Sequence, residues 1–340
     1  MDFPMSPTRP SWDMLLGQHS LLEHRTSRGW FEKRVVRLHD ERYVLYRFPV
    51  RSHARRLAWL LETMKARGAA LQRYVTHIDD LRSALTRGGF WVASSFAPGR
   101  PIIGAGTPQQ IEALGRVLGT LHQEENHNHG MLFSLAPGFS SYARVLRQEL
   151  TGALHSMTSP PPQLHECLTR HSGFLDQART FQLTHGDLHG KNIIAQDDGI
   201  VLVDYELARF EAAGMELATA LLRTFCGETE FESRPLRAAL LGGYMQTCPP
   251  HLREMWEQHA PFFLIAAAAR MAGNRRSRAH RLARRGQPSR MTLYQAAGYE
   301  RWAYGMCELH ARGIHHADRL LDLCHWEVPP GLAVPESAEA

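Results

Sequence analysis

The sequence predicts an α+β fold with two lobes, a small N-terminal lobe built on an antiparallel sheet and a larger, mostly helical C-terminal lobe. Residues 20–50 alternate between apolar and polar in strand fashion, and the chain from residue 215 onward follows helical periodicity. A chain of 340 residues is long enough for two separate cores. We place the N-terminal lobe at 1–97, the C-terminal lobe at 98–328 and a frayed tail rich in Pro, Ala and Glu at 329–340.

The N-terminal lobe begins with a predicted hairpin. Residues 30–38 and 43–48 read as two strands, and the polar residues between them form the turn. Residues 53–67 then follow a helical pattern, with Leu57, Leu60, Leu61 and Met64 on one face. The apolar run at 90–96 is a further strand, and the Pro- and Gly-containing residues after it end the lobe.

The C-terminal lobe opens with a well-marked helix. Thr107 is the predicted N-cap, Pro108 takes the first helical position and Gln110 completes a capping box. Further helices are predicted over four later stretches, at 215–224, 235–246, 251–271 and 292–312. We find no internal repeat in this lobe.

The strongest chemical signal lies between residues 184 and 206. The loop 185–192 carries Asp187 and Asn192, and two short apolar strands separated by Asp-Asp-Gly follow, after which comes Asp204. A hairpin of this kind would bring Asn192 and Asp204 together. An aspartate that orients an attacking hydroxyl, with an amide and a carboxylate that hold Mg²⁺, is the set that phosphoryl transfer needs.

The same residues resemble a known family. His185-Gly186-Asp187-Leu188-His189-Gly190-Lys191-Asn192, followed by Val203-Asp204-Tyr205-Glu206, is similar to the signature of the aminoglycoside phosphotransferase and choline kinase family. The resemblance implies a protein-kinase-like fold, with Asp187 as catalytic base, Asn192 and Asp204 as metal ligands, and His185 as a brace for the loop. Gly186 and Tyr205-Glu206 favour the small-molecule branch, because protein kinases carry His-Arg-Asp and Asp-Phe-Gly at these places.

One position departs from the family pattern. The family usually has a lysine, or sometimes an arginine, on the second strand to bind the nucleotide phosphates, whereas this chain has Tyr46 and Arg47 there. We expect Arg47 to take this role, since guanidinium pairs with both phosphate and carboxylate, and Glu62 to steady it. If Tyr46 faces the nucleotide instead, the usual cation is missing. His189 and Lys191 are candidates for a further donor near the transferred group.

Composition narrows the class of protein. With 44% apolar and 21% charged residues the chain is typical of globular proteins, and it has no apolar run of the roughly 20 residues that span a bilayer. The N-terminus lacks the pattern of a signal peptide. Five scattered cysteines without paired spacing predict reduced thiols and a cytoplasmic location. We interpret the arginine-rich stretch 270–290 as a solvated helix face or loop rather than a nucleic-acid interface.

These observations predict an ATP-dependent phosphotransferase that uses Mg²⁺ and acts on a hydroxyl of a small molecule, such as an amino sugar or amino alcohol. GTP is an alternative donor. Two other classes stay open: a nucleotide-binding pseudokinase that serves as an interaction module, and a kinase of a sugar phosphate, lipopolysaccharide or protein. The sequence leaves the acceptor and the oligomeric state open.

Overall fold

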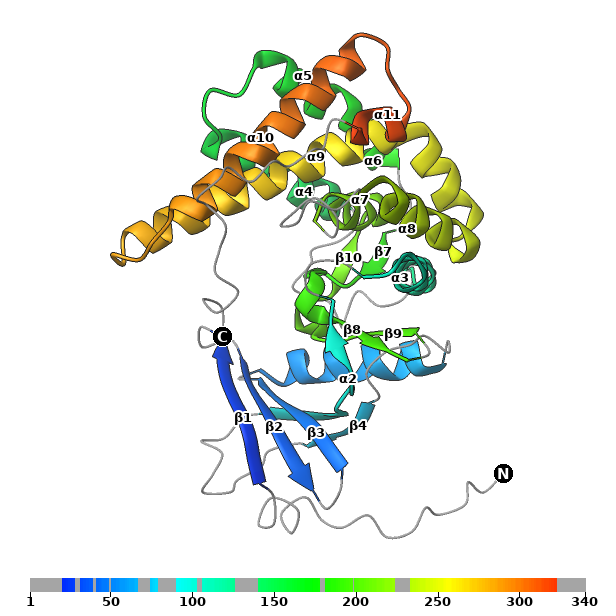
Figure 1. Cartoon of the computed structure of the whole chain (residues 1–340), viewed down its shortest axis with the longest axis vertical. Coiled ribbons are helices and arrows are strands. Elements are labelled where there is room, and N and C mark those ends of the chain that lie inside the picture. The colour runs from blue at the N-terminus through cyan, green and yellow to red at the C-terminus, as the bar shows by residue number, and fades with distance from the viewer. Residues whose placement is uncertain are drawn as a thin grey trace. The chain divides into compact units, whose positions relative to one another are not determined.

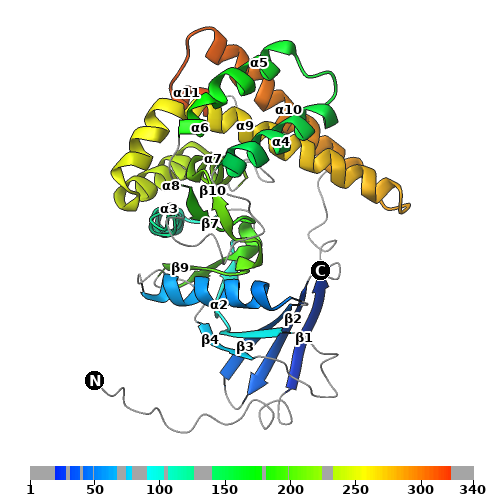
Figure 2. The same cartoon turned by 180° about the vertical axis from the view of Figure 1, so that it is seen from behind.

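The computed structural model describes residues 20–27, 31–38, 41–48, 50–66, 74–78, 90–102, 106–125, 140–177, 181–197, 199–223 and 233–322. Its contacts divide the chain into two units (Figures 1 and 2). Unit 1 comprises Met1–Arg100 and Val201–Glu206, and unit 2 comprises Pro101–Ile200 and Leu207–Ala340. The predicted tail 329–340 lies outside the described residues.

Unit 1 is built on a five-stranded sheet of order β1-β2-β3-β5-β4, in which all neighbouring strands are antiparallel. Val36, Leu45, Trp91 and Ala93 form a buried cluster within it. One helix packs against β3, β4 and β5 and buries three leucines that its periodicity selects, Leu57, Leu60 and Leu61. The bounds of these elements are β1 (Ser20–Ser27), β2 (Phe31–Leu38), β3 (Glu41–Phe48), α2 (Arg51–Ala66), β4 (Tyr74–Ile78) and β5 (Phe90–Ser95).

The predicted hairpin, helix and later strand of the N-terminal lobe are confirmed as β2, β3, α2 and β5, with ends that shift by two residues or fewer. Strand β4 was not predicted. Its five residues give too short a pattern to separate a strand from a loop.

From Arg100 onward the chain is mostly helical, with short strands between the helices. The hairpin expected between Asn192 and Asp204 is present as β8 and β9, in a sheet of order β6-β8-β9, and β10 pairs with β7. The elements are β6 (Arg100–Pro101), α3 (Pro108–Leu121), α4 (Ser140–Ser156), α5 (Pro162–Arg170), η1 (His171–Gly173), α6 (Phe174–Gln177), β7 (Gln182–Thr184), η2 (Gly190–Asn192), β8 (Ile193–Gln196), β9 (Gly199–Leu202), η3 (Tyr205–Leu207), β10 (Arg209–Glu211), α7 (Ala213–Arg223), α8 (Ser233–Thr247), α9 (Pro250–Ala283), α10 (Arg290–Ala311) and α11 (Ala317–Leu321).

The start of α3 matches the capping box predicted from its sequence. The Thr107 hydroxyl accepts a hydrogen bond from the Gln110 backbone N–H at 3.3 Å, and the Gln110 side chain accepts one from the Thr107 N–H at 3.0 Å. Helix α3 then packs closely on α8, because glycines on both helices remove the side chains that would hold the backbones apart.

Helix α9 is longer than the sequence indicated. The predicted helix 251–271 continues to Ala283, so part of the arginine-rich stretch is helical. Arginine is a good helix former, and Gly273, which follows Met271 closely, does not end the helix because it is buried against Ala153 of α4. Helices α9 and α10 run side by side (Figures 1 and 2). Among the described helices, none is long and apolar enough to cross a membrane.

Candidate active site

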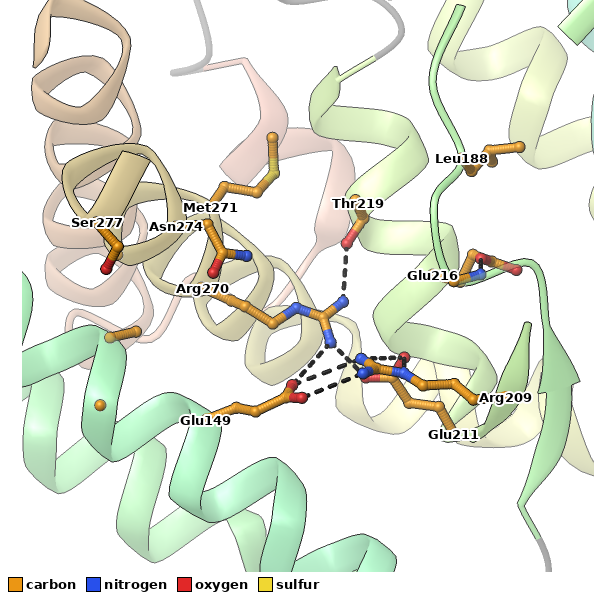
Figure 3. Close-up of a pocket in the computed structure, with 14 residues that line it drawn as sticks. Glu149, Leu188, Arg209, Glu211, Glu216, Thr219, Arg270, Met271, Asn274 and Ser277 are labelled. Atoms are coloured by element: carbon orange, nitrogen blue, oxygen red, sulfur yellow. Dashed lines mark hydrogen bonds and ion pairs between the residues drawn. The ribbon is translucent and has the colours of Figure 1, made fainter. Parts of the chain in front are cut away.

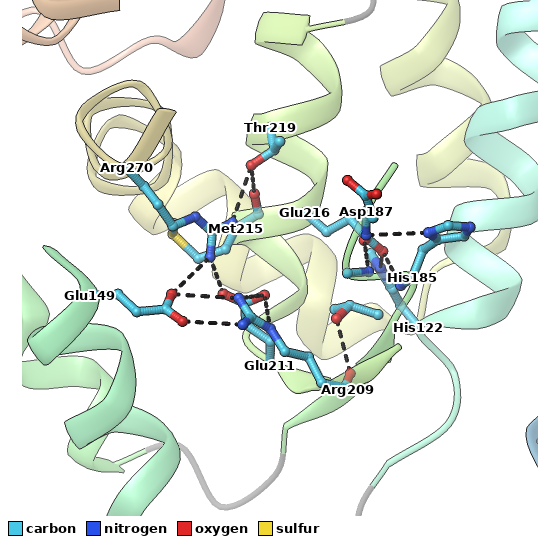
Figure 4. A network of polar contacts seen from close by, with 12 residues as sticks. His122, Glu149, His185, Asp187, Arg209, Glu211, Met215, Glu216, Thr219 and Arg270 are labelled. Atoms are coloured by element: carbon cyan, nitrogen blue, oxygen red, sulfur yellow. Dashed lines mark hydrogen bonds and ion pairs between the residues drawn. The ribbon is translucent and has the colours of Figure 1, made fainter. Parts of the chain in front are cut away.

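The loop that carries Asp187 follows β7 and is anchored by the buried carboxylate of Glu216 on α7 (Figure 4). One Glu216 oxygen accepts the backbone N–H of His185 and the other accepts that of Gly186, both at 2.9 Å. His122 of α3 reaches the same carboxylate through Nε2 at 3.1 Å. Burial raises the pKa of Glu216, but its contacts with His122 and His185 outweigh this effect and hold the pKa below its usual range.

Glycine is favoured at position 186 because the backbone there has dihedral angles that residues with a side chain rarely adopt. Its φ of +81° is left-handed, and an added Cβ would lie 2.1 Å from the carbonyl oxygen of Leu207. His185 is fully buried, and its Nδ1 accepts the backbone N–H of Asp187 at 3.3 Å. The backbone around Asp187 is therefore fixed by the Glu216 carboxylate and by the His185 ring.

The Asp187 side chain itself stays accessible. It is 39% exposed, and its Oδ2 lies 3.6 Å from Nε2 of His189. Asn192 is buried and donates its side-chain N–H to the Asp187 carbonyl at 2.9 Å, so its amide oxygen is the atom left to accept a cation. Lys191 is exposed on the same loop. The structure thus brings Asp187, His189 and Asn192 together in unit 2.

Asp204 belongs to unit 1, where two side chains of the sheet contact it. Lys33 of β2 places its Nζ 2.5 Å from Asp204 Oδ1, and the Tyr46 hydroxyl of β3 donates to the same oxygen at 3.0 Å. Asp204 has a left-handed φ of +67°, a conformation that aspartate adopts more readily than most residues.

The structure differs from the sequence-based prediction in the residue that supplies the positive charge near Asp204. Tyr46 faces Asp204, and Arg47 follows it in the strand, so Arg47 points to the opposite face of the sheet. The cation that reaches Asp204 is Lys33, which the sequence analysis did not select. Lys33 lies directly opposite Tyr46 in the β2–β3 register, so the hairpin pairing could have revealed it. Glu62 is exposed near the end of α2.

Asn192 and Asp204 have the ligand chemistry that a hard divalent cation requires, since both offer oxygen atoms. The carboxylate of Asp204 already holds one positive charge, that of Lys33. The described part of the chain contains no group of three His, Cys, Asp or Glu side chains arranged as a complete metal site.

A pocket of about 380 Å³ lies in unit 2 against the loop of Asp187 (Figure 3). Gly186 and Leu188, the two neighbours of Asp187 in the chain, line it. Its polar residues come from separate elements: Glu149 from α4, Arg209 and Glu211 from β10, Thr219 from α7, and Arg270 from α9. Arg270 belongs to the arginine-rich stretch that the sequence indicated as solvated, but its side chain is only 13% exposed and pairs with Glu211. The other four residues are spread over three elements of the chain, so no local sequence pattern marks them.

Two arginines and two glutamates form a closed network in this pocket (Figures 3 and 4). Arg270 pairs with Glu211 and lies 3.5 Å from Glu149, and it also donates to the Thr219 hydroxyl at 3.3 Å. Arg209 pairs with Glu149 and with Glu211, each at 3.1 Å. Burial raises the pKa of Glu211, but Arg270 and Arg209 outweigh it and keep the pKa below its usual range.

The chain is similar to a known protein family over most of its length. The model of a family described as "Phosphotransferase enzyme family" matches residues 25–262. A search of curated protein sequences found no match.

Solved structures share the fold at low sequence identity. Amicoumacin kinase hAmiN, in complex with AMP-PNP, Ca²⁺ and Ami, has a TM-score of 0.53 at 16% identity over 86% of this chain and 89% of its own. An aminoglycoside phosphotransferase from Alicyclobacillus acidocaldarius has a TM-score of 0.53 at 16% identity, with coverage of 91% and 98%. Choline kinase from Cryptosporidium parvum has a TM-score of 0.53 at 13% identity, with coverage of 92% and 96%. These likenesses confirm the predicted α+β, protein-kinase-like fold.

Proposed function

Because this chain belongs to the phosphotransferase enzyme family, we propose that it transfers the terminal phosphate of ATP to a hydroxyl group of a small molecule, with Asp187 as the base. The observation that carries the proposal is the loop of Asp187. Hydrogen bonds with Glu216 and His185, and the left-handed conformation of Gly186, fix the backbone of this loop. The Asp187 carboxylate stays accessible to a ligand. A fixed backbone with an accessible carboxylate is what orients an acceptor hydroxyl and takes its proton.

Asn192 and Asp204 are the residues that would hold Mg²⁺. When bound, the ion would offset negative charge on the nucleotide phosphates. Two observations support this assignment: the Asn192 side chain, whose N–H donates to the Asp187 carbonyl and whose oxygen can accept a cation, and the attraction of Asp204 for the Lys33 ammonium. The structure of amicoumacin kinase contains AMP-PNP and Ca²⁺, which supports the use of ATP and a divalent metal by a protein of this fold.

Lys33 is our candidate for the cation that binds the nucleotide phosphates. It shares a sheet face with Tyr46 and contacts the proposed metal ligand Asp204, whereas Arg47 and its predicted partner Glu62 are not at that contact. A lysine at this contact removes the main reason for the pseudokinase alternative, which was the missing cation. His189, through its position 3.6 Å from Asp187, is a candidate donor to the transferred group, with Lys191 next to it on the loop.

We further propose that the protein works in the cytoplasm on small molecules rather than on nucleic acid. The described cysteines Cys167, Cys248 and Cys307 are free thiols, as expected in a reducing compartment. Within the basic stretch, Arg270 and Arg276 are engaged by Glu211 and Glu300.

The decisive experiment is Asp187→Asn, assayed for ATP consumption against a library of small hydroxyl compounds. Loss of the base should lower kcat about 10²–10⁴-fold and leave nucleotide affinity nearly unchanged, since the amide keeps the size of the side chain. Asp197→Asn is the matched control, because Asp197 is exposed in the β8–β9 turn. Asp204→Ala should instead abolish the metal-dependent part of nucleotide binding. Near-normal turnover by Asp187→Asn would contradict the proposal.

A further inference from the structure

The pocket beside Asp187 carries almost no uncompensated charge. Arg209 and Arg270 supply two positive charges, and Glu149 and Glu211 supply two negative charges that pair with them. Arg209 makes its contacts through Nε and both terminal nitrogens, so most of its donors are already used by the two carboxylates. A ligand in the pocket therefore meets hydrogen-bond donors and acceptors whose charges cancel, rather than a net positive or negative charge.

Glu216, a third carboxylate at this pocket, does not add free negative charge. Both of its oxygens accept backbone N–H groups of the Asp187 loop, and one also contacts His122. It is 5% exposed, so a ligand in the pocket meets little of it. The negative charge of Glu216 is therefore compensated by the loop and by His122, and it is not available to a ligand.

This arrangement disfavours strongly charged acceptors of either sign. A polycation would meet two arginines and would have to compete with them for Glu149 and Glu211. An anion would have to displace one of those carboxylates, and Glu211 is buried, so leaving it unpaired is costly. Among the described lining residues there is also no aromatic ring of the kind that binds quaternary ammonium groups.

Neutral hydroxyl groups suit the pocket better, because each one both donates and accepts a hydrogen bond. Glu149 is 33% exposed and can accept, and Arg209 is 41% exposed and can donate at its edge. Asn274 and Ser277 add neutral polar groups at the wall formed by α9. The volume of about 380 Å³ lies at the lower end of the range typical of small-molecule sites.

We propose that this pocket binds a neutral, polyhydroxylated acceptor, such as a sugar or cyclitol, and discriminates against densely charged ones. The inference rests on the proposed phosphotransferase function and specifies its acceptor class. Arg209 and Arg270 act as the specificity-determining residues, because they neutralise the glutamates that would otherwise attract a cationic acceptor.

The test measures binding to the full-length Asp187→Asn protein by calorimetry, so that turnover is not needed. The probes are a library of neutral sugars and cyclitols, each compared with an amino derivative and a phosphate derivative of the same ring, for example glucose, glucosamine and glucose 6-phosphate. We expect the tightest ligand to be neutral, with a Kd at least about tenfold below those of its charged relatives. Its Kd should change less than about twofold between 50 and 500 mM NaCl, since screening acts on charges.

Arg270→Met should reverse the preference. It leaves Glu149 and Glu211 with one cation between them, so the ratio of Kd values for the neutral and amino forms of a ring should shift at least about tenfold toward the amino form. Arg209→Gln, at a more exposed position, tests the same shift if Arg270→Met does not fold. Arg276→Met is the matched control, because it breaks a comparable ion pair of α9, with Glu300 of α10, outside the described pocket lining.

The inference is overturned if the tightest ligand is cationic or anionic, if no neutral compound binds, or if the preference is unchanged in both arginine variants. Binding of a neutral ligand with no phosphate transfer by the wild-type protein would refute the proposed function, while the preference of the pocket for neutral ligands would stand. Phosphate transfer to a sugar with several amino groups would support the proposed function and refute the preference for neutral acceptors.

Discussion

Glu216 determines the local geometry of the proposed catalytic loop although it is distant from it in sequence. Its two oxygens accept the backbone N–H groups of His185 and Gly186, the two residues that follow β7. The carboxylate itself is buried and receives compensation from these N–H groups and from His122. The loop conformation and the ionisation of Glu216 are therefore coupled.

We predict that Glu216→Gln lowers both stability and turnover. The amide can accept with one oxygen only, so one of the two backbone N–H groups loses its acceptor, at a cost of about 1–3 kcal/mol in the free energy of unfolding. Urea denaturation followed by fluorescence measures the loss. Glu308→Gln is the control, since its i,i+4 pair with Arg312 is exposed and worth less than about 1 kcal/mol. Equal stability of the two variants would contradict this role of Glu216.

Arg47 illustrates the limit of choosing a residue by type. Guanidinium chemistry favoured it, but strand alternation places it on the face opposite to Tyr46, and Tyr46 is the residue that contacts Asp204. Lys33 reaches Asp204 because the β2–β3 register sets it beside Tyr46. The selection of side chains at a sheet thus depends on the pairing of strands, which residue type alone does not give.

At the scale of elements, the approach of α3 and α8 depends on glycine. Added Cβ atoms would lie 2.1 Å from the Leu240 carbonyl oxygen at Gly115 and 2.0 Å from the Glu112 carbonyl oxygen at Gly243. Backbone atoms cannot move aside as a flexible side chain can. These positions therefore set the distance between the two helices.

We predict opposite effects of alanine at two neighbouring positions of α8. Gly243→Ala should destabilise the protein by about 1–3 kcal/mol or more, because the helices must separate. Gly242→Ala should be neutral or stabilise by up to about 1 kcal/mol, since nothing lies within 4 Å of its Cβ and alanine favours a helix. Thermal unfolding of the two variants gives the comparison. A similar melting temperature for both would show that the helices do not depend on this contact.

Other elements follow from short-range rules. The capping box at Thr107 and the β8–β9 hairpin are confirmed because each is specified by residues a few positions apart. The end of α9 was predicted wrongly at Met271. The arginines beyond it have no apolar stripe that would mark a helix, yet α9 packs on α10 and Arg276 pairs with Glu300 across that contact. Tertiary packing thus extends a helix that local pattern does not define.

At the scale of the whole molecule, two buried glutamates with lowered pKa values link stability to pH. Glu211 and Glu216 are ionised in the folded protein because arginines and histidine contacts offset their burial. A carboxylate whose pKa is lower in the folded state stabilises the fold above its unfolded pKa. That contribution is lost as pH falls through the folded pKa.

We predict that the free energy of unfolding is steady near neutral pH and falls as the pH drops below about 4.3, the usual pKa of glutamate. Urea denaturation at a series of pH values between 6 and 3 measures the decline. The Glu216→Gln variant should lose part of this pH dependence, because one of the two groups no longer titrates. Equal slopes in the variant and the wild-type protein would assign the acid sensitivity to other groups.

The sequence by itself determined the fold class, the order of most elements and the chemical signature Asp187, Asn192 and Asp204. These features depend on periodicity, capping and spacing, each of which is specified by residues close together in the chain. Only the tertiary structure identified Lys33, which contacts Asp204 across 171 positions, and Glu216, which holds the loop 30 and 31 positions before it. It also assembled the Arg–Glu pocket from four separate elements. The physical reason is that a charged side chain is buried only where the fold supplies its partners, and those partners come from distant parts of the chain.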